Sequence, residues 1–300
     1  MIRFDDQVAL ITGAGKGLGR AYAEALAARG ARIVVNNRTH PEDGARGSAD
    51  EVADGIRARG GEAVADYESV EAAGAGIRMV EHALDRFGRL DVLVCNAGGG
   101  HASIFHKASL QNIREQIEIN TMGTLAPIHA ALPHMREAGY GRILTTTSNA
   151  GMFGAVGWAA YAASKSAMHG FVPSIADENR RRGVQINAIL PFAHTALTGD
   201  LFVASDYPEG TEKRLRTEIV ADLAVWLVSR ECELSGEILL GGGRVFRRAR
   251  MVQTRGVELD DPTPERIAER ADAICDMDEL ILYGDTPTLL RDIAERAAEG

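Results

Sequence analysis

The sequence predicts an α/β protein with a doubly wound, mostly parallel sheet of seven strands and helices on both faces. Short apolar runs of β-type residues alternate with longer amphipathic stretches over the first 243 residues, as in parallel sheets that are covered on both sides. One strand and its helix occupy about 30 residues, the usual length of a βαβ step. The chain has 300 residues, 45% of them hydrophobic and 25% charged, which is enough for one large core.

Six of the predicted strands are clear apolar runs: Val8–Ile11, Ile33–Val35, Val92–Val94, Ile143–Leu144, Ile186–Leu190 and Ile238–Leu240. The predicted helices lie between them, at Leu18–Arg29, Ser48–Arg59, Ala75–Phe87, Leu110–Glu137, Trp158–Arg182 and Glu212–Arg230. The alternation stops after Gly243. We therefore expect one domain over residues 1–243 and an extension over 244–300 that packs on this domain or on a partner subunit.

Charge and cysteine content exclude several classes of protein. The 42 acidic residues outnumber the 33 basic ones, and the net charge of −9 repels nucleic acid. The three cysteines are far apart and form no disulfide framework, which favours a reducing compartment. The first residues, Met1–Asp6, include acids where a signal peptide is apolar, and no apolar run reaches the length of a membrane span. We expect a cytoplasmic protein without membrane contact.

A glycine-rich turn, Thr12–Gly19, follows the first strand and opens the first helix. A glycine-rich motif alone is weak evidence, but a turn between a strand and a helix places the helix N-terminus against a bound pyrophosphate. The motif in this position therefore predicts a dinucleotide site. Glycine at 13 allows a tight turn, glycines at 15 and 17 allow a close approach of the backbone, and Gly19 allows close helix–sheet packing. The candidate contacts in this turn are Gly13, Gly15, Lys16, Gly17, Leu18 and Gly19.

The end of the second strand indicates the form of the cofactor. NAD-binding folds place an acid there for the ribose 2′-hydroxyl, whereas this chain has Asn37 and Arg38. Arg38 and Lys16 can pair with a 2′-phosphate, so charge favours NADP(H), with NAD(H) as the alternative if both cations are only solvated. Beyond the fourth strand, Asn96, Ala97 and Gly98 lie where the adenosine ribose would pass. A long irregular stretch at 36–47 is expected to border the cofactor.

Four residues form the predicted catalytic set: Asn120, Ser148, Tyr161 and Lys165. Tyr161 and Lys165 are four residues apart and share a helix face, so the ammonium can favour the phenolate. Neutral Tyr161 can donate a proton to a developing alkoxide, Ser148 can hold the substrate oxygen, and Asn120 can connect Lys165 to water. Each of these residues alone is common in a structural role, but the set behind a nucleotide turn indicates a carbonyl/alcohol oxidoreductase.

Other readings of the sequence are weaker. The eight histidines are scattered without a metal-binding motif, so we expect no metal site. A nucleotide-binding regulatory protein without catalysis is the non-enzyme alternative. An intact catalytic set argues against it.

On these residues the chain resembles the short-chain dehydrogenase/reductase family, whose pattern is T-G-x-x-x-G-x-G, N-A-G, a helical Asn, Ser and Y-x-x-x-K. The resemblance implies a Rossmann-type fold, NAD(P) contacts at Gly13, Lys16, Leu18 and Asn96, and binding of the nicotinamide ribose by Lys165 beside Tyr161. It also implies an adenine-edge site at Glu68 and Ser69. The family's Pro-Gly after the sixth strand is Pro191-Phe192 here, which leaves contacts by Phe192, His194 and Thr195 open.

Within the family, the chain is most similar to the (3R)-hydroxyacyl-CoA dehydrogenases, including an extension with Thr263-Pro264-Glu265. The resemblance implies a 3-hydroxyacyl/3-oxoacyl-CoA substrate and a homodimer or homotetramer. Bulky ring ketones such as steroids are the alternative, because Met152, Phe153 and Trp158 would make an apolar wall. Five arginines between positions 244 and 255, with no acid among them, would suit coenzyme A phosphates, a subunit contact or a solvated face equally well.

Overall fold

The structure of the chain is a computed structural model that describes residues 1–38, 47–195, 208 and 210–298. The central part of the irregular stretch expected at 36–47 lies outside these residues. The described chain divides into two compact units, Met1–Arg248 and Ala249–Gly300.

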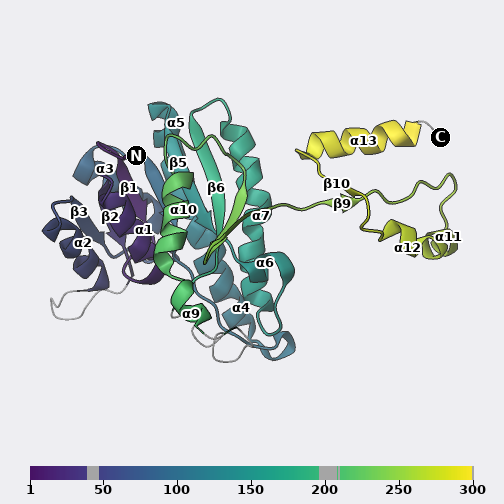
Figure 1. The fold of residues 1–300 in the computed structure, drawn as a ribbon, viewed down its shortest axis with the longest axis horizontal. Coiled ribbons are helices and arrows are strands. Elements are labelled where there is room, and N and C mark those ends of the chain that lie inside the picture. Colours follow the sequence, from purple (N-terminus) through teal and green to yellow (C-terminus); the bar gives the residue numbers. More distant parts are fainter. Residues whose placement is uncertain (39–46, 196–207, 209, 299–300) are drawn as a thin grey trace. The chain divides into compact units, whose positions relative to one another are not determined.

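The first unit contains one eight-stranded sheet in the order β3-β2-β1-β4-β5-β6-β7-β8 (Figure 1). Strands β1 to β7 are parallel and β8 pairs with β7 as the antiparallel edge strand. The predicted doubly wound, mostly parallel sheet is thus confirmed, with one strand more than expected. The strands are β1 Val8–Ile11, β2 Arg32–Asn36, β3 Ala63–Asp66, β4 Val92–Cys95, β5 Gly141–Thr146, β6 Val184–Pro191, β7 Ile238–Gly242 and β8 Val245–Ala249.

The additional strand β8 carries two of the clustered arginines, Arg247 and Arg248. It follows β7 after Gly243, whose φ of 60° suits the tight connection. Arg248 pairs with the largely buried Glu237 at the base of β7, with nitrogen–oxygen distances of 2.6 and 2.8 Å. The exposed arginines of β8 discourage another strand from pairing with this edge of the sheet.

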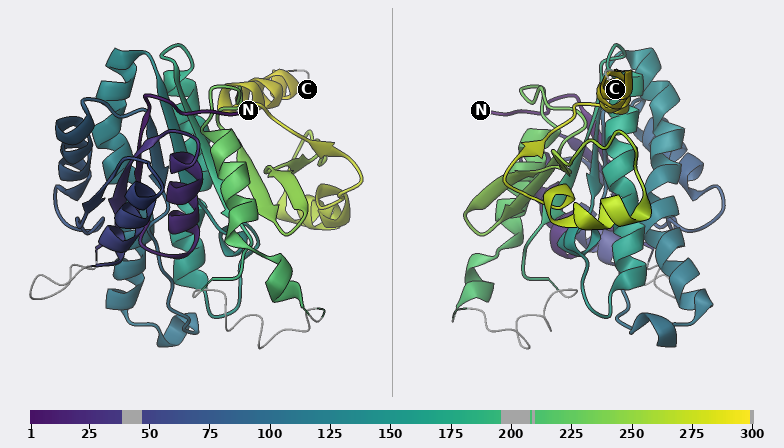
Figure 2. Two further views of the ribbon diagram at one scale, coloured as in Figure 1. Left: turned by 60° about the vertical axis from the view of Figure 1, so that its left-hand side comes forward. Right: turned by 90° about the vertical axis from the view of Figure 1, so that its right-hand side faces the viewer.

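Helices cover both faces of the sheet (Figures 1 and 2). Contacts between elements group α1, α2 and α10 on one side, and α3, α5 and α7 on the other. The strands of the middle of the sheet are buried along their whole length, as in a sheet with two covered faces. The helices are α1 Gly17–Ala27, α2 Ser48–Ala58, α3 Ala75–Phe87, α4 Leu110–Ile117, α5 Gly123–Ala138, α6 Asn149–Phe153, α7 Ala159–Asn179, α9 Thr211–Arg214 and α10 Thr217–Leu227, with a short 3₁₀ turn at Phe105–Lys107.

Two predicted helices are interrupted. The helix expected at Leu110–Glu137 contains a π-helical turn, Glu118–Met122, between α4 and α5. Pro127 cannot donate to the carbonyl of Gly123, and the Thr124 hydroxyl donates to the carbonyl of Asn120 at 2.9 Å, so regular α-helical bonding is disturbed there.

The helix expected at Glu212–Arg230 ends once and restarts, because Leu215 is nearly buried and its carbonyl accepts the backbone N–H of His194 at 2.8 Å. A carbonyl bound by another segment does not serve the helix.

The second unit contains a two-stranded antiparallel sheet and three helices. Thr263 caps α11 by accepting the backbone N–H of Arg266 at 3.2 Å, and Pro264 occupies the first turn. No described residue of this unit is fully buried, so it has no core of its own. Its elements are β9 Gln253–Thr254, α11 Pro264–Glu269, α12 Ala271–Ile274, β10 Leu280–Ile281 and α13 Thr286–Ala298.

None of the helices in the described parts of the chain combines the length and the apolar character that crossing a membrane requires.

Candidate active site

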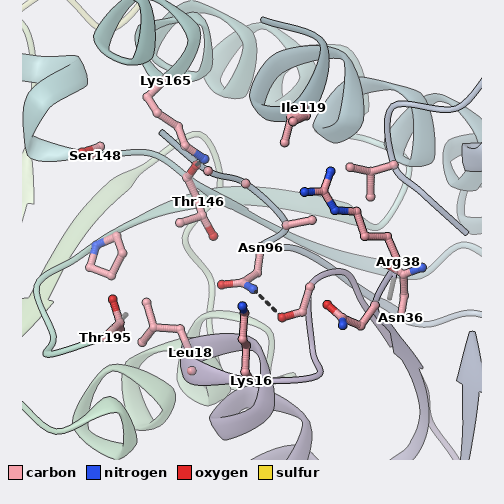
Figure 3. A pocket seen from close by; sticks show the side chains of 18 of the residues that line it. Lys16, Leu18, Asn36, Arg38, Asn96, Ile119, Thr146, Ser148, Lys165 and Thr195 are labelled. Atoms are coloured by element: carbon pink, nitrogen blue, oxygen red, sulfur yellow. Dashed lines mark hydrogen bonds between the residues drawn. The ribbon is translucent and has the colours of Figure 1, made fainter. Parts of the chain in front are cut away.

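A cavity of about 470 Å³ opens at the carboxyl ends of the parallel strands, where ligands bind in sheets of this kind. Figure 3 shows Ser148 and Lys165 on one side of the pocket and Arg38 on the opposite side, with Lys16 and Asn96 between them. The lining residues are Gly13, Lys16, Gly17, Leu18, Asn36, Asn37, Arg38, Glu68, Val70, Glu71, Asn96, Ala97, Gly98, Gly99, Ile119, Thr146, Thr147, Ser148, Tyr161, Lys165, Pro191, Ala193 and Thr195.

Most of the candidate residues that the sequence singles out line this one cavity. Four of them do not: Gly15, Gly19, Ser69 and Asn120. At the end of β6 and just beyond it, the cavity is lined by Pro191, Ala193 and Thr195. Phe192 and His194 do not line it.

The glycine turn is held from below by Asn96. The Asn96 side-chain amide donates to the carbonyls of Thr12 and Gly13 at 3.1 and 3.2 Å. Gly13 has a φ of 64°, and a Cβ there would lie 2.8 Å from the Cα of Ala97. A Cβ at Gly19 would collide with the carbonyl of Gly13. The turn therefore requires glycine at both positions for its own packing.

Gly15 and Gly17 differ in their surroundings. A side chain at Gly15 would collide with Ser48 and would lie 2.9 Å from the amide of Asn37, so the protein itself fills this space. Gly17 has φ 56° with nothing within 4 Å of its missing Cβ, and it lines the cavity. Of the two glycines, Gly17 is the one that leaves backbone accessible to a ligand.

The end of the pocket beyond β2 and β3 is charged. The Asn37 amide donates to the Ser48 hydroxyl at 2.7 Å. Arg38 forms an ion pair with Glu71 at 2.7 Å between Nη1 and Oε1, and Glu68 forms one with Arg78 at 2.7 Å. Glu68, which the sequence singled out, and Glu71, which it did not, thus place two carboxylates beside the cations and amides of this region.

The other end of the pocket contains Tyr161 and Lys165, both on α7 and both buried. The Lys165 ammonium donates to the carbonyl of Thr146 at 2.9 Å, and burial lowers the pKa of Lys165 to about 8. Burial raises the pKa of Tyr161, although a hydrogen bond with Ser148 acts in the opposite direction. With its pKa raised, Tyr161 is a neutral phenol at pH 7.

Ser148 and Asn120 are placed by their backbone surroundings. Ser148 caps α6 by accepting the N–H of Ala150 at 3.2 Å, and it also lines the pocket. Asn120 lies in the π-helical turn, is fully buried, and joins the loop after β4 to α7. Its amide nitrogen donates to the Gly99 carbonyl (2.8 Å) and to the Ser164 hydroxyl (3.1 Å), and its amide oxygen accepts the Gly99 N–H (3.0 Å).

Gly98 shows how closely these groups approach one another. A Cβ at Gly98 would lie 2.7 Å from the amide oxygen of Asn120 and 3.2 Å from the ammonium of Lys165. The amide of Asn120 is thus bonded to Gly99 and Ser164, and its backbone carbonyl accepts the Thr124 hydroxyl, so a link from Lys165 to water through Asn120 stays a prediction.

Some lining residues were not singled out from the sequence. Glu71 is three residues after Glu68, a spacing that a search for paired acids beyond β3 would have found. Thr146 and Thr147 immediately precede Ser148, and the Thr147 hydroxyl donates to the Lys165 carbonyl at 3.0 Å. Among the described residues, no three His, Cys, Asp or Glu side chains are grouped to hold a metal ion.

A family model described as short chain dehydrogenase matches residues 7–202. The chain belongs to the short-chain dehydrogenase/reductase family. It is thus a short-chain oxidoreductase, and members of this family bind NAD(P)(H).

The relatives extend over nearly the whole chain. The peroxisomal multifunctional enzyme type 2 of Mus musculus is 38% identical over 92% of this chain, which covers 37% of that enzyme. The full-length structure of the same enzyme from Drosophila melanogaster superposes with a TM-score of 0.83 at 31% identity, covering 98% of this chain and 50% of that one. The chain therefore spans half or less of these multifunctional enzymes.

A third similar structure is a 7α-hydroxysteroid dehydrogenase in complex with NADH and 7-oxo glycochenodeoxycholic acid. Its TM-score is 0.71 at 29% identity, and it covers 81% of this chain and 95% of that one.

Proposed function

We propose that the protein interconverts a secondary alcohol and a ketone with NAD(P)(H), most favourably on a 3-hydroxyacyl/3-oxoacyl-CoA. One observation carries this proposal: Tyr161, Ser148 and Lys165 line the same cavity as the glycine turn. A proton donor and a nucleotide turn in one pocket are what carbonyl reduction requires.

The residues divide the chemistry among them. Neutral Tyr161 donates its proton to the substrate oxygen during reduction and takes it back during oxidation. Ser148 orients that oxygen, and Lys165 is held in place by the carbonyl of Thr146. Asn120 does not line the pocket and acts by positioning the Gly99 loop against α7.

The pocket suits a dinucleotide because Gly17 lines it at the start of α1 with nothing within 4 Å of its missing Cβ, which leaves backbone accessible to a phosphate. When bound, the nicotinamide supplies or accepts the hydride. We propose contacts by Gly13, Lys16, Gly17, Leu18 and Asn96, with Lys165 at the nicotinamide ribose. The absence of an acid at Asn37 and the cations Arg38 and Lys16 favour NADP(H), and NAD(H) is the alternative.

The acyl-CoA substrate is proposed from the resemblance to hydroxyacyl-CoA dehydrogenases. A bulky ring ketone is favoured by a different observation: Phe153 at the end of α6 and Val156 after it are 79% and 91% exposed and offer apolar surface. The steroid in the similar 7α-hydroxysteroid dehydrogenase supports this second candidate. The clustered arginines give less support to coenzyme A than the sequence indicated, because Arg248 and Arg255 form ion pairs with Glu237 and Glu279.

The test is ketone reduction by the wild-type protein and by Tyr161→Phe. The variant keeps the ring but removes the proton donor, so we expect kcat to fall by at least about 10³-fold while the Kd for NADPH changes less than about twofold. Equal turnover of the two proteins would refute the role of Tyr161.

The substrate class is tested in the same assay. We expect a short 3-oxoacyl-CoA to give a higher kcat/KM than a ring ketone such as an oxo-steroid, and free coenzyme A to inhibit turnover. A higher kcat/KM for the steroid, without inhibition by coenzyme A, would establish the second candidate instead.

We further propose that the protein works in the cytoplasm as a homodimer or homotetramer. The three cysteines form no disulfide, and Cys95 and Cys232 are buried, which suits a reducing compartment. Light scattering after size exclusion tests the assembly, and a monomeric mass would refute it.

A further inference from the structure

The charged end of the pocket contains an ion pair that joins two parts of the chain far apart in sequence. Arg38 follows β2 and Glu71 follows β3, and both line the cavity. Their 2.7 Å contact is made by side chains that are 60% and 29% exposed, respectively. Because both side chains are partly exposed, the ion pair is weak enough for a bound ligand to compete with Glu71 for Arg38.

Glu71 is a carboxylate at neutral pH. Burial alone would raise its pKa, but hydrogen bonds from Ser69 and Arg38 hold its pKa below the usual value. Its second oxygen, Oε2, is buried, and within the described parts of the chain no donor reaches it. Glu71 therefore places a full negative charge beside Arg38.

The negative charge of Glu71 opposes binding of a 2′-phosphate, the group that distinguishes NADP(H) from NAD(H). A 2′-phosphate needs the guanidinium of Arg38, but that group is already paired with Glu71. The amide of Asn37 uses one of its two N–H groups on Ser48 and carries no charge, so it does not compensate a phosphate as a guanidinium does. A phosphate entering here must displace a carboxylate or bind next to one, and both cost free energy.

We propose that Glu71 is a specificity-determining residue that reduces the preference of the site for a 2′-phosphorylated cofactor by holding Arg38. The proposal rests on the proposed function, since it concerns the adenosine end of the same nucleotide pocket. An uncharged ribose 2′-hydroxyl makes no demand on Arg38 and is not repelled by Glu71.

The same wall of the pocket offers a matched control. Glu68 also lines the cavity and is also paired with an arginine, Arg78, at 2.7 Å, but Arg78 does not line the cavity. Glu68→Gln thus removes the same charge from the same end without releasing Arg38. A purely long-range effect of charge would be similar in Glu68→Gln and Glu71→Gln, whereas release of Arg38 occurs only in Glu71→Gln.

The experiment measures the Kd of NADPH and of NADH by isothermal titration calorimetry, at fixed ionic strength, for the wild type and four variants. These are Glu71→Gln, Glu68→Gln, Arg38→Gln and the double variant of Arg38 and Glu71. We expect Glu71→Gln to increase the ratio Kd(NADH)/Kd(NADPH) by at least about fivefold through tighter NADPH binding. The increase should be less than about twofold for Glu68→Gln, and less than about twofold when Glu71→Gln is added to Arg38→Gln.

Three results would overturn the inference: an unchanged ratio in Glu71→Gln, an equal increase in Glu68→Gln, or an undiminished increase in the absence of Arg38. Cooperative unfolding of each variant in urea shows that it is folded. If the wild type bound neither nucleotide, the proposed function itself would fail. If it bound both and the ratio did not move, only the role of Glu71 would be wrong.

Discussion

The two ends of the pocket are built differently. At the chemical end, Asn120, Tyr161 and Lys165 are at most 9% exposed, and Asn120 and Lys165 hydrogen-bond to main-chain groups. At the other end, Arg38, Glu71, Glu68 and Arg78 are partly exposed and bond to one another through side chains. Main-chain partners fix a geometry, whereas exposed side-chain pairs can exchange partners. The fold thus holds the reacting groups by main-chain hydrogen bonds. The side chains at the nucleotide-selecting end are held only by ion pairs that can exchange partners.

The largest effect that tests this comparison is expected at Lys165. Lys165→Met should lower kcat by at least about 10²-fold, because it removes the buried cation beside Tyr161. The same variant should unfold at a higher urea concentration at pH 7, with up to about 3 kcal/mol of additional stability, because burial lowers the pKa of Lys165 from 10.5 to about 8. Lys165 would then be a residue that catalysis requires but that lowers the free energy of unfolding.

The sign of this effect can be checked with pH. Between about pH 8 and pH 10.5 the unfolded chain still holds the lysine proton that the folded chain has released, so wild-type stability rises with pH in this window. The advantage of Lys165→Met in urea unfolding should therefore shrink from pH 7 to pH 10. Lys107→Met, at an exposed position, serves as the control. A constant advantage at all pH values would argue against a strained buried cation.

An intermediate effect is expected at Asn120. Asn120→Ala removes three hydrogen bonds that hold the Gly99 loop against α7, so we expect a loss of about 1–3 kcal/mol in urea unfolding and a kcat lower by about tenfold or more.

Thr121→Val is the matched control for Asn120→Ala. It removes one bond between the same π-helical turn and α7, from the Thr121 hydroxyl to the Ser164 carbonyl at 2.9 Å, but none to the Gly99 loop. If both variants lowered kcat equally, Asn120 would have no special part in positioning this loop.

The smallest effect is expected at His82, which bonds to Asp66 next to the adenosine end of the pocket. Asp66 bonds to His82 at 2.8 Å and to the pocket residue Asn36 at 2.6 Å. The bond with Asp66 raises the pKa of His82, so the charged pair is fully present below pH 6.5 and is lost as pH rises through the raised pKa. In thermal or urea unfolding, His82→Gln should destabilise by at most about 1 kcal/mol at pH 5.5 and by less at pH 8.5. The opposite order would show that the neutral histidine matters more.

Features that depend on local sequence were predicted well. The strand at Val8–Ile11 and the helix at Ala75–Phe87 have the expected bounds, because burial on both faces or on one helical stripe leaves a clear pattern. The glycine turn and the residues after β4, β5 and β6 meet at one cavity because parallel strands bring their carboxyl ends together.

Features set by distant contacts were not predicted. The break near Leu215 depends on a hydrogen bond from His194, and the ion pair of Arg38 depends on Glu71, which is 33 residues away. The π-helical turn around Asn120 goes with the missing donor at Pro127 and the hydrogen bond from the Thr124 side chain, neither of which an apolar pattern reports. Charge arguments made from neighbours in sequence therefore counted Arg38 as unopposed.

The hydrogen bond between His194 and Leu215 bears on how the chain length between these residues can vary in evolution. It joins the residues after β6 to the end of α9 at 2.8 Å, and so closes a loop in the chain between two described points. An insertion or exchange within such a closed segment costs only a small loop-closure entropy, about 0.6 kcal/mol for each doubling of length. The number of residues between these two positions can therefore change among relatives at a small cost in free energy, while β6 keeps its register with β5 and β7.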